Sequence, residues 1–152
     1  MTAPKQNFMD SCLFFNTNAF SRHLLKLAEA AFSDIGLSPA HASLLLLVYE
    51  TPGISPKDLS RLLQLNPSTV TRFVDALVKK KLVRKVTRGK VAFIHPTAKA
   101  DALRSRVAEA YKPLYLKYTE ILGPETAILL SQQIAGANQK VKDVLADAKT
   151  TD

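Results

Sequence analysis

The chain has 152 residues, of which 47% are hydrophobic and 22% charged, and its formal net charge is +8. These values are ordinary for a folded domain with its own apolar core. The longest apolar run, residues 44–49, is far shorter than the roughly 18–20 residues that cross a bilayer. The first residues lack the pattern of a signal peptide, so we expect a cytoplasmic protein that does not enter membranes. A single cysteine, Cys12, excludes an internal disulfide and a multi-cysteine zinc site.

The first third of the chain predicts two helices. Apolar residues at helical spacing predict a long helix over residues 10–32, and the very apolar stretch 39–50 predicts a second helix that is buried nearly all round. Proline follows a capping residue at Ser38, Ser55 and Asn66, which is the pattern of a helix N-cap followed by the first helical residue.

The middle of the chain predicts two short helices and a β-hairpin. The helices cover residues 56–65 and 67–81, with a tight turn between them. Residues 82–87 and 90–95 carry β-branched and aromatic side chains and flank Arg88 and Gly89, which predict a two-residue hairpin turn. His95-Pro96 and Gly123-Pro124 then open two long helices, over residues 97–122 and 124–148. The expected fold class is mainly α.

Positive charge is concentrated between residues 55 and 100. This segment has eleven Lys and Arg against two Asp, a net charge of +9, whereas the whole chain carries +8. The remainder of the chain is therefore almost neutral. A positive field confined to one helix-turn-helix-like segment favours the docking of a polyanion there.

The second short helix has the pattern of a DNA-recognition helix. Its apolar residues form one stripe, while Ser68, Arg72 and Lys79 share the opposite face. One α-helix fits the major groove, where the fork of an arginine reaches guanine O6 and N7 together, so we expect Arg72 to contact a guanine. Lysines and arginines at the helix end and in the hairpin are better suited to phosphates. The residues expected to contact DNA are Lys57, Ser68, Thr69, Thr71, Arg72, Lys79, Arg84, Arg88 and Lys90.

At these residues the chain resembles the MarR family of winged helix-turn-helix transcriptional regulators. The resemblance rests on residues 59–65 (LSRLLQL), 68–78 (STVTRFVDALV) and 80–84 (KKLVR), with Thr97 where the family starts its fifth helix. It implies one MarR-like domain over residues 1–152, with a winged helix-turn-helix lobe at 36–96 and dimerisation helices at 1–35 and 97–152. It also implies double-stranded DNA and a second copy of the chain as partners.

The chain departs from the family pattern in the region that follows the recognition helix. Lys81 stands where the family usually has glycine, and a left-handed lysine costs on the order of 1 kcal/mol. We therefore expect the recognition helix to end differently here. The wing is shorter than usual, and Arg88 and Lys90 align with the family's Asp-x-Arg tip. We expect this wing to contact phosphate.

Cys12 is a candidate redox site by resemblance alone. Part of the family senses organic hydroperoxides through a lone cysteine in this region. The tyrosines that accompany it in that branch are missing, because Lys26 and Leu37 stand near their expected positions. The apolar residues 13–15 next to Cys12 predict burial, so we favour a structural cysteine.

Several aromatic residues are candidates for an effector pocket, which in this family lies between the dimerisation helices and the DNA-binding lobes. The candidate effector-binding residues are Phe15, Tyr49, Tyr111 and Tyr115. The alternative is that each belongs to a helix–helix core.

No arrangement of residues predicts catalysis. His23, His41 and His95 are scattered, and the sequence holds no glycine-rich phosphate loop and no nucleophile or metalloprotease motif. We expect no enzyme, no metal and no cofactor. The sequence predicts a homodimeric DNA-binding regulator, a repressor that a small-molecule effector releases from a pseudo-palindromic operator. The alternatives are a hydroperoxide-sensing repressor that uses Cys12 and, from another class, a helical protein–protein interaction module with a basic face.

Overall fold

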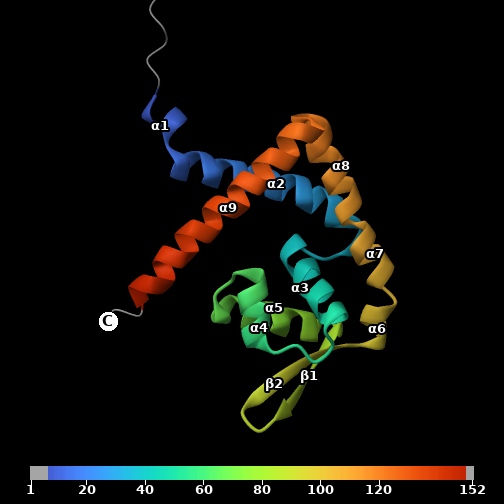
Figure 1. The fold of residues 1–152 in the computed structure, drawn as a ribbon. Helices are drawn as coiled ribbons and strands as arrows, with labels where there is room; N and C mark the ends of the chain where they lie inside the picture. Colours follow the sequence, from blue (N-terminus) through green and yellow to red (C-terminus); the bar gives the residue numbers. More distant parts are fainter. Residues whose placement is uncertain (1–6, 150–152) are drawn as a thin grey trace, which may run out of the picture. The chain divides into compact units, whose positions relative to one another are not determined.

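The computed structural model describes residues 7–149. The chain divides into two compact units, of which the first ends at Leu114 and the second begins at Tyr115. The described residues form helices and one two-stranded sheet (Figure 1). None of the helices among residues 7–149 is by itself long and apolar enough to cross a membrane. The pair that reaches this length together, residues 13–35 and 39–50, is bent by 64°.

The helix predicted over residues 10–32 is interrupted at Cys12. Helix α1 covers Phe8–Ser11 and α2 covers Leu13–Phe32, while Cys12 between them is extended, with φ −81° and ψ 110°. The side-chain amide of Asn16 donates to the Asp10 carbonyl at 3.0 Å, and the Ser11 hydroxyl donates to the Phe8 carbonyl. Such local side-chain bonds compete with a continuous helix, so the prediction was wrong at its start.

Helix α3 (Pro39–Glu50) follows the 3₁₀ turn η1 (Ser33–Ile35) and lies at the centre of the first unit. It begins as predicted, because the Ser38 hydroxyl accepts a hydrogen bond from the His41 amide at 3.2 Å and Pro39 is the first helical residue. Its Leu44, Leu45 and Val48 are fully buried, which confirms the predicted core helix.

Helices α4 (Pro56–Leu63) and α5 (Pro67–Lys79) form the predicted helix-turn-helix, each slightly shorter than expected. Ser55 caps α4, whereas the Asn66 side chain makes no capping hydrogen bond to α5. The turn between them holds Gln64 in the left-handed region, with φ 54°.

Strands β1 (Val83–Arg88) and β2 (Val91–Pro96) pair in antiparallel register from Val83 opposite Pro96 to Arg88 opposite Val91. The turn is therefore Gly89-Lys90, one residue later than predicted, and glycine supplies the positive φ of 62° that its first position requires. Pro96 ends the wing strand and does not open a helix as predicted. The next helix starts after Thr97, whose hydroxyl accepts from the Ala100 amide.

The helix predicted over residues 97–122 is divided into α6 (Ala98–Asp101), α7 (Arg104–Glu109) and α8 (Tyr111–Leu122). Pro113 accounts for the second break, because proline has no N–H to donate to the Glu109 carbonyl four residues earlier. Helix α9 (Pro124–Lys149) begins at Pro124 as predicted.

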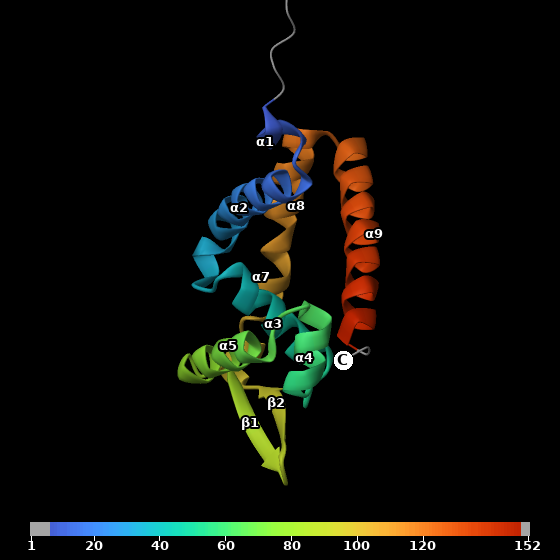
Figure 2. The same cartoon turned by 90° about the vertical axis from the view of Figure 1, so that its left-hand side faces the viewer.

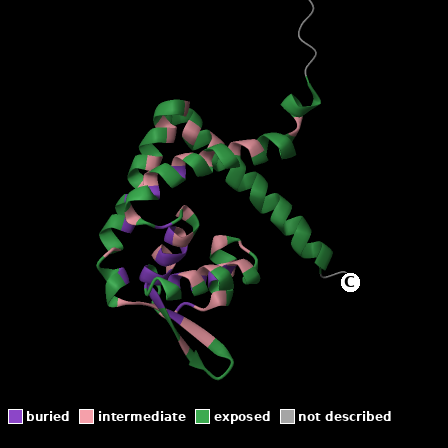
Figure 3. Ribbon diagram, turned by 180° about the vertical axis from the view of Figure 1, so that it is seen from behind, coloured by how far each residue is buried: buried purple, intermediate pink, exposed green. Residues whose placement is uncertain are grey.

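Buried side chains belong to the first unit and gather on α3 and the elements around it (Figure 3). Phe32, Leu59, Leu77, Ile94 and Val107 join the buried leucines of α3 in one apolar cluster. This cluster holds α4, α5 and the root of the wing as one body, so it fixes the position of the basic segment.

Candidate nucleic-acid interface

Helix α5 has one buried face and one polar face. Val70, Val74 and Leu77 are buried, and the hydrophobic effect fixes this side against the lobe core. On the other side Ser68, Thr71, Arg72 and Lys79 are exposed, while Thr69 is half-buried. Within residues 7–149 no charged residue is buried.

The basic residues predicted to contact DNA share one property. Within the described part of the chain none of them makes an ion pair or hydrogen bond through its side chain. They are Lys57, Arg72, Lys79, Arg84, Arg88 and Lys90, and all of them are exposed. Their charges are therefore available to an anionic partner without the loss of an internal contact.

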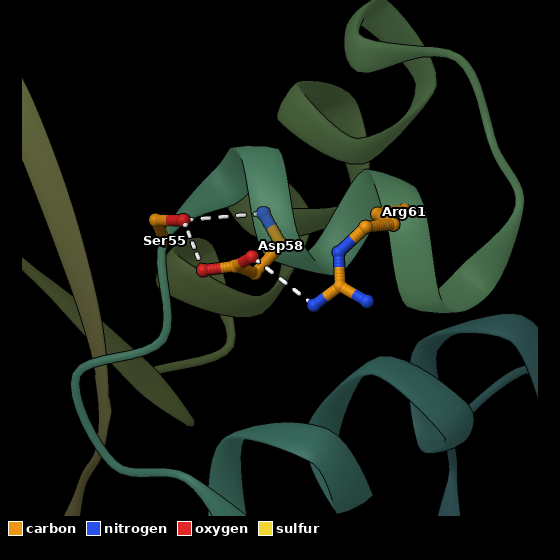
Figure 4. Close-up of polar contacts among 3 residues, drawn as sticks. All are labelled: Ser55, Asp58 and Arg61. Carbon is orange, nitrogen blue, oxygen red and sulfur yellow. Dashed lines mark hydrogen bonds and ion pairs between the residues drawn. The ribbon is translucent and has the colours of Figure 1, made fainter.

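Two other basic residues of the segment are paired with the only carboxylates there. Arg61 lies 3.2 Å from Asp58 on α4 (Figure 4). Ser55 donates to the same carboxylate at 2.9 Å and accepts from the Asp58 amide at 3.1 Å. The Ser55 hydrogen bond, with a further one from Arg61, lowers the pKa of Asp58 below its usual value.

The second pair joins the recognition helix to the wing. Lys85 on β1 lies 2.5 Å from the Asp75 carboxylate on α5. Asp75 shares the polar face of α5, where an uncompensated negative charge would repel phosphate. Lys85 therefore neutralises Asp75, a role that the sequence, in which the two residues stand ten positions apart, did not reveal.

Lys81 adopts the left-handed conformation that the sequence reasoning excluded, with φ 59°. The Lys81 amide donates to the Val78 carbonyl and the Leu82 amide to the Leu77 carbonyl, both at 2.9 Å. This is the Schellman ending of a helix, usually made with glycine. The Thr97 hydroxyl donates to the Lys81 carbonyl at 2.6 Å and so helps to hold this ending in place.

The wing extends away from α4 and α5 (Figure 2). Because alternate residues of a strand point to opposite faces, Arg84 and Arg88 lie on one face of β1 and Lys85 on the other. Lys90 lies in the turn at the tip. The wing thus presents three unpaired cations beside those of α4 and α5.

The aromatic effector candidates lie in different surroundings. Tyr49 is buried, its hydroxyl donates to the Ala100 carbonyl, and the Arg104 guanidinium lies 4.7 Å from the centre of its ring. Burial, with a smaller contribution from Asp101, raises the pKa of Tyr49 to about 12. Tyr111 is half-buried, packs edge-on against Phe32 and shares a 2.7 Å hydrogen bond with Ser43.

The other two candidates are more accessible. The Phe15 residue is 38% exposed, and Tyr115, in the second unit, is 49% exposed. Among the described residues of the first unit, no ring pair and no hydrogen bond joins Phe15, Tyr49 and Tyr111 to one another.

Cys12 is half-buried in the extended link between α1 and α2. The burial expected of its neighbours is absent in the single chain, because Leu13 and Phe14 are each 79% exposed. These apolar residues at the start of α2 lie outside the core of the first unit, and the structural role of Cys12 stays a prediction.

Residues 37–88 match the model of the MarR family, and no curated protein sequence matches the chain. The solved structure of the transcriptional repressor CouR bound to a 23-mer DNA duplex is 20% identical, with a TM-score of 0.77 over 90% of this chain and 99% of that one.

Two further solved structures are similar. CouR from Rhodococcus jostii RHA1 bound to p-coumaroyl-CoA is 19% identical, with a TM-score of 0.70 over 88% of this chain and 93% of that one. The S. aureus MepR–DNA complex is 14% identical, with a TM-score of 0.74 over 86% and 98%. At these identities the likenesses concern the fold alone. Residues 37–88 thus match the MarR family model, and the chain has the winged-helix fold of these solved structures.

Proposed function

We propose that this protein is a homodimeric, sequence-specific DNA-binding transcriptional repressor. The observation that carries the proposal is the set of unpaired cations on α4, α5 and the wing, within a lobe of the MarR family. Arg72 recognises a guanine in the major groove, and Ser68, Thr69 and Thr71 contact the DNA beside it. Lys57, Lys79, Arg84, Arg88 and Lys90 contact phosphates and position the helix.

Dimerisation gives the protein two recognition helices. No residue of α8 or α9 is buried, and Ile121, Leu129, Val144 and Leu145 are all more than half exposed. Apolar surface of this extent favours burial against a second copy. The two copies would then bind the half-sites of a pseudo-palindromic operator.

A small-molecule effector releases the operator in this proposal. DNA-bound and ligand-bound forms of CouR share this fold, which supports a similar pair of states here. Phe15 and Tyr115 keep exposed ring surface for an effector. Tyr49 and Tyr111 already use their hydroxyls within the lobe, so any effector contact through them would involve their rings.

The proposal is tested by selecting a duplex from a random library and footprinting it. Two protected half-sites support a dimeric DNA reader, and capture of an acidic protein without any footprint would support the interaction module in its place. Arg72→Ala is expected to lose about 1–3 kcal/mol of binding free energy that discriminates between bases at one position of each half-site. Equal losses on operator and random DNA would remove Arg72 from base recognition.

Arg61→Ala is the matched control, because Asp58 already holds that guanidinium. It is expected to leave the sequence preference unchanged. Lys79→Ala is expected to weaken binding to all DNA sequences alike. It is also expected to reduce the slope of log affinity against log salt concentration by roughly one unit per subunit.

For Cys12 we propose a structural role. Cumene hydroperoxide is then expected to leave operator binding unchanged in both the wild type and Cys12→Ser. Release of the wild type at stoichiometric peroxide, with the variant spared, would establish the redox alternative.

A further inference from the structure

The hydroxyl of Thr71 is already engaged on the polar face of the recognition helix. Its Oγ1 donates to the Pro67 carbonyl one turn earlier at 3.0 Å. Threonine commonly makes this bond in helices. Because a hydroxyl has one hydrogen, Thr71 cannot donate to a base or a phosphate while this bond lasts.

The bond also decides which group the side chain presents. With Oγ1 donating to the helix backbone, this exposed residue offers a partner its methyl group and an oxygen that can accept but not donate a hydrogen bond. Ser68, one turn earlier on the same face, differs from Thr71. No hydrogen bond involves the Ser68 side chain among residues 7–149, so its hydroxyl remains free to donate.

Among the base edges of the major groove, the C5-methyl of thymine is the apolar group. The major-groove edge of guanine presents hydrogen-bond acceptors. Thr71 has no hydrogen left to donate to them, whereas the neighbouring Arg72 guanidinium has several. We propose that Thr71 is a specificity residue that recognises a thymine in each half-site through contact between the two methyl groups. This inference rests on the proposed DNA-binding function.

The test replaces each thymine of the selected operator in turn by deoxyuridine, which removes only the C5-methyl. Affinity is measured by fluorescence anisotropy for the wild type and for Thr71→Val, Thr71→Ser and Thr71→Ala. At one thymine in each half-site the wild type is expected to lose about fourfold in affinity, the effect of one methyl group returned to water.

The variants separate the methyl group from the hydroxyl. Thr71→Val keeps the methyl and is expected to bind as the wild type does, with the same loss on deoxyuridine. Thr71→Ser and Thr71→Ala lose the methyl contact in both subunits, so they are expected to bind the thymine operator about fifteenfold more weakly and to show no further loss on deoxyuridine. Ser68→Ala, the control, is expected to weaken binding while leaving the deoxyuridine profile unchanged.

Failure of this inference differs from failure of the proposed function. A wild type that binds its operator with no deoxyuridine-sensitive thymine would overturn the role of Thr71, as would a Thr71→Ser variant that binds like the wild type while Thr71→Val is weakened. Absence of any footprint would overturn the DNA-binding proposal on which the role depends. Circular dichroism of each variant confirms that the helix is intact.

Discussion

At the scale of single residues, the backbone of Lys81 is strained, and a substitution by glycine removes this strain. Its φ of 59° favours glycine, and a left-handed lysine costs about 1–2 kcal/mol. Lys81→Gly is therefore expected to stabilise the fold by roughly 0.5–1 kcal/mol, because glycine's greater freedom in the unfolded chain offsets part of the gain. The measurement is the free energy of unfolding in urea.

Lys80→Gly is the matched control for this prediction. It makes the same change in charge one residue earlier, where the backbone is right-handed with φ −76°, and it also removes the 3.4 Å hydrogen bond from the Lys80 ammonium to the Gly36 carbonyl. Glycine is expected to destabilise the fold there. If both variants lowered the free energy of unfolding equally, the strain assigned to Lys81 would be absent.

His41 gives the lobe a pH dependence. Burial, with the nearby charge of Lys80 as the second cause, lowers the pKa of His41 below 6.5, and its ring packs edge-on against Phe73 of α5. The unfolded chain therefore binds a proton more readily than the folded chain. Stability from this residue is expected to fall as the pH drops through about 6.5 and to be unaffected above it.

The check is thermal unfolding at pH 7.5 and pH 5.5. His41→Gln is expected to lose less stability than the wild type between these two values. His23→Gln, at an exposed position, is the control and is expected to behave as the wild type does. An identical fall in all three proteins would exclude His41 as the cause.

At the scale of elements, Pro113 explains why α7 and α8 are separate helices. It is the third residue of α8, in the first turn, where its missing N–H costs no hydrogen bond within that helix. Pro113→Ala is expected to restore an amide that can donate to the Glu109 carbonyl. The result should be one helix over residues 104–122 and a gain in stability on the order of 1 kcal/mol.

Amide hydrogen exchange of residues 111–116 measures this change, with slower exchange as the expected result. Pro124→Ala is the control. The left-handed Gly123 before it, with φ 81°, separates α8 from α9 whether or not proline follows. Unchanged exchange at residues 111–116 in Pro113→Ala would mean that another feature sets the break.

The helix ends show which structural features can be predicted from neighbouring residues in the sequence. Helix starts at Ser38, Ser55 and Pro124 were predictable, because a cap and a proline are adjacent in the chain. The break at Cys12 was not, since it depends on side chains that bond to carbonyls three and six residues away.

The same distinction applies to the interface. The concentration of basic residues on α4, α5 and the wing followed from the density of charge along the sequence. The pairing of Lys85 with Asp75 required knowledge of how the wing lies against α5. The left-handed Lys81 required the Schellman bonds that form only in the folded lobe. Residue type and spacing thus predicted where basic residues gather, while tertiary contacts decided which of their charges are unpaired.

At the scale of the whole molecule, the exposed apolar residues of the last helix are expected to be covered by a second copy. Ile134, Val141 and Leu145 recur at spacings of seven and four residues, so they share one face of α9. Each is at least 45% exposed in the single chain. Not every apolar residue of the predicted dimerisation helix 97–122 is available to a second copy. Val107 is fully buried in the apolar cluster of the first unit.

Val141→Glu is therefore expected to convert the dimer into a monomer at micromolar concentration, since a charge would have to enter the apolar contact between copies. Gln132→Glu introduces the same charge on the opposite face of α9 and is expected to remain dimeric. Sedimentation velocity measures both. Val141→Glu should also lose operator affinity, although every residue expected to contact DNA is unchanged, because one lobe alone holds one half-site. A wild type that sediments as a folded monomer and still protects two half-sites would show that α9 has a different partner.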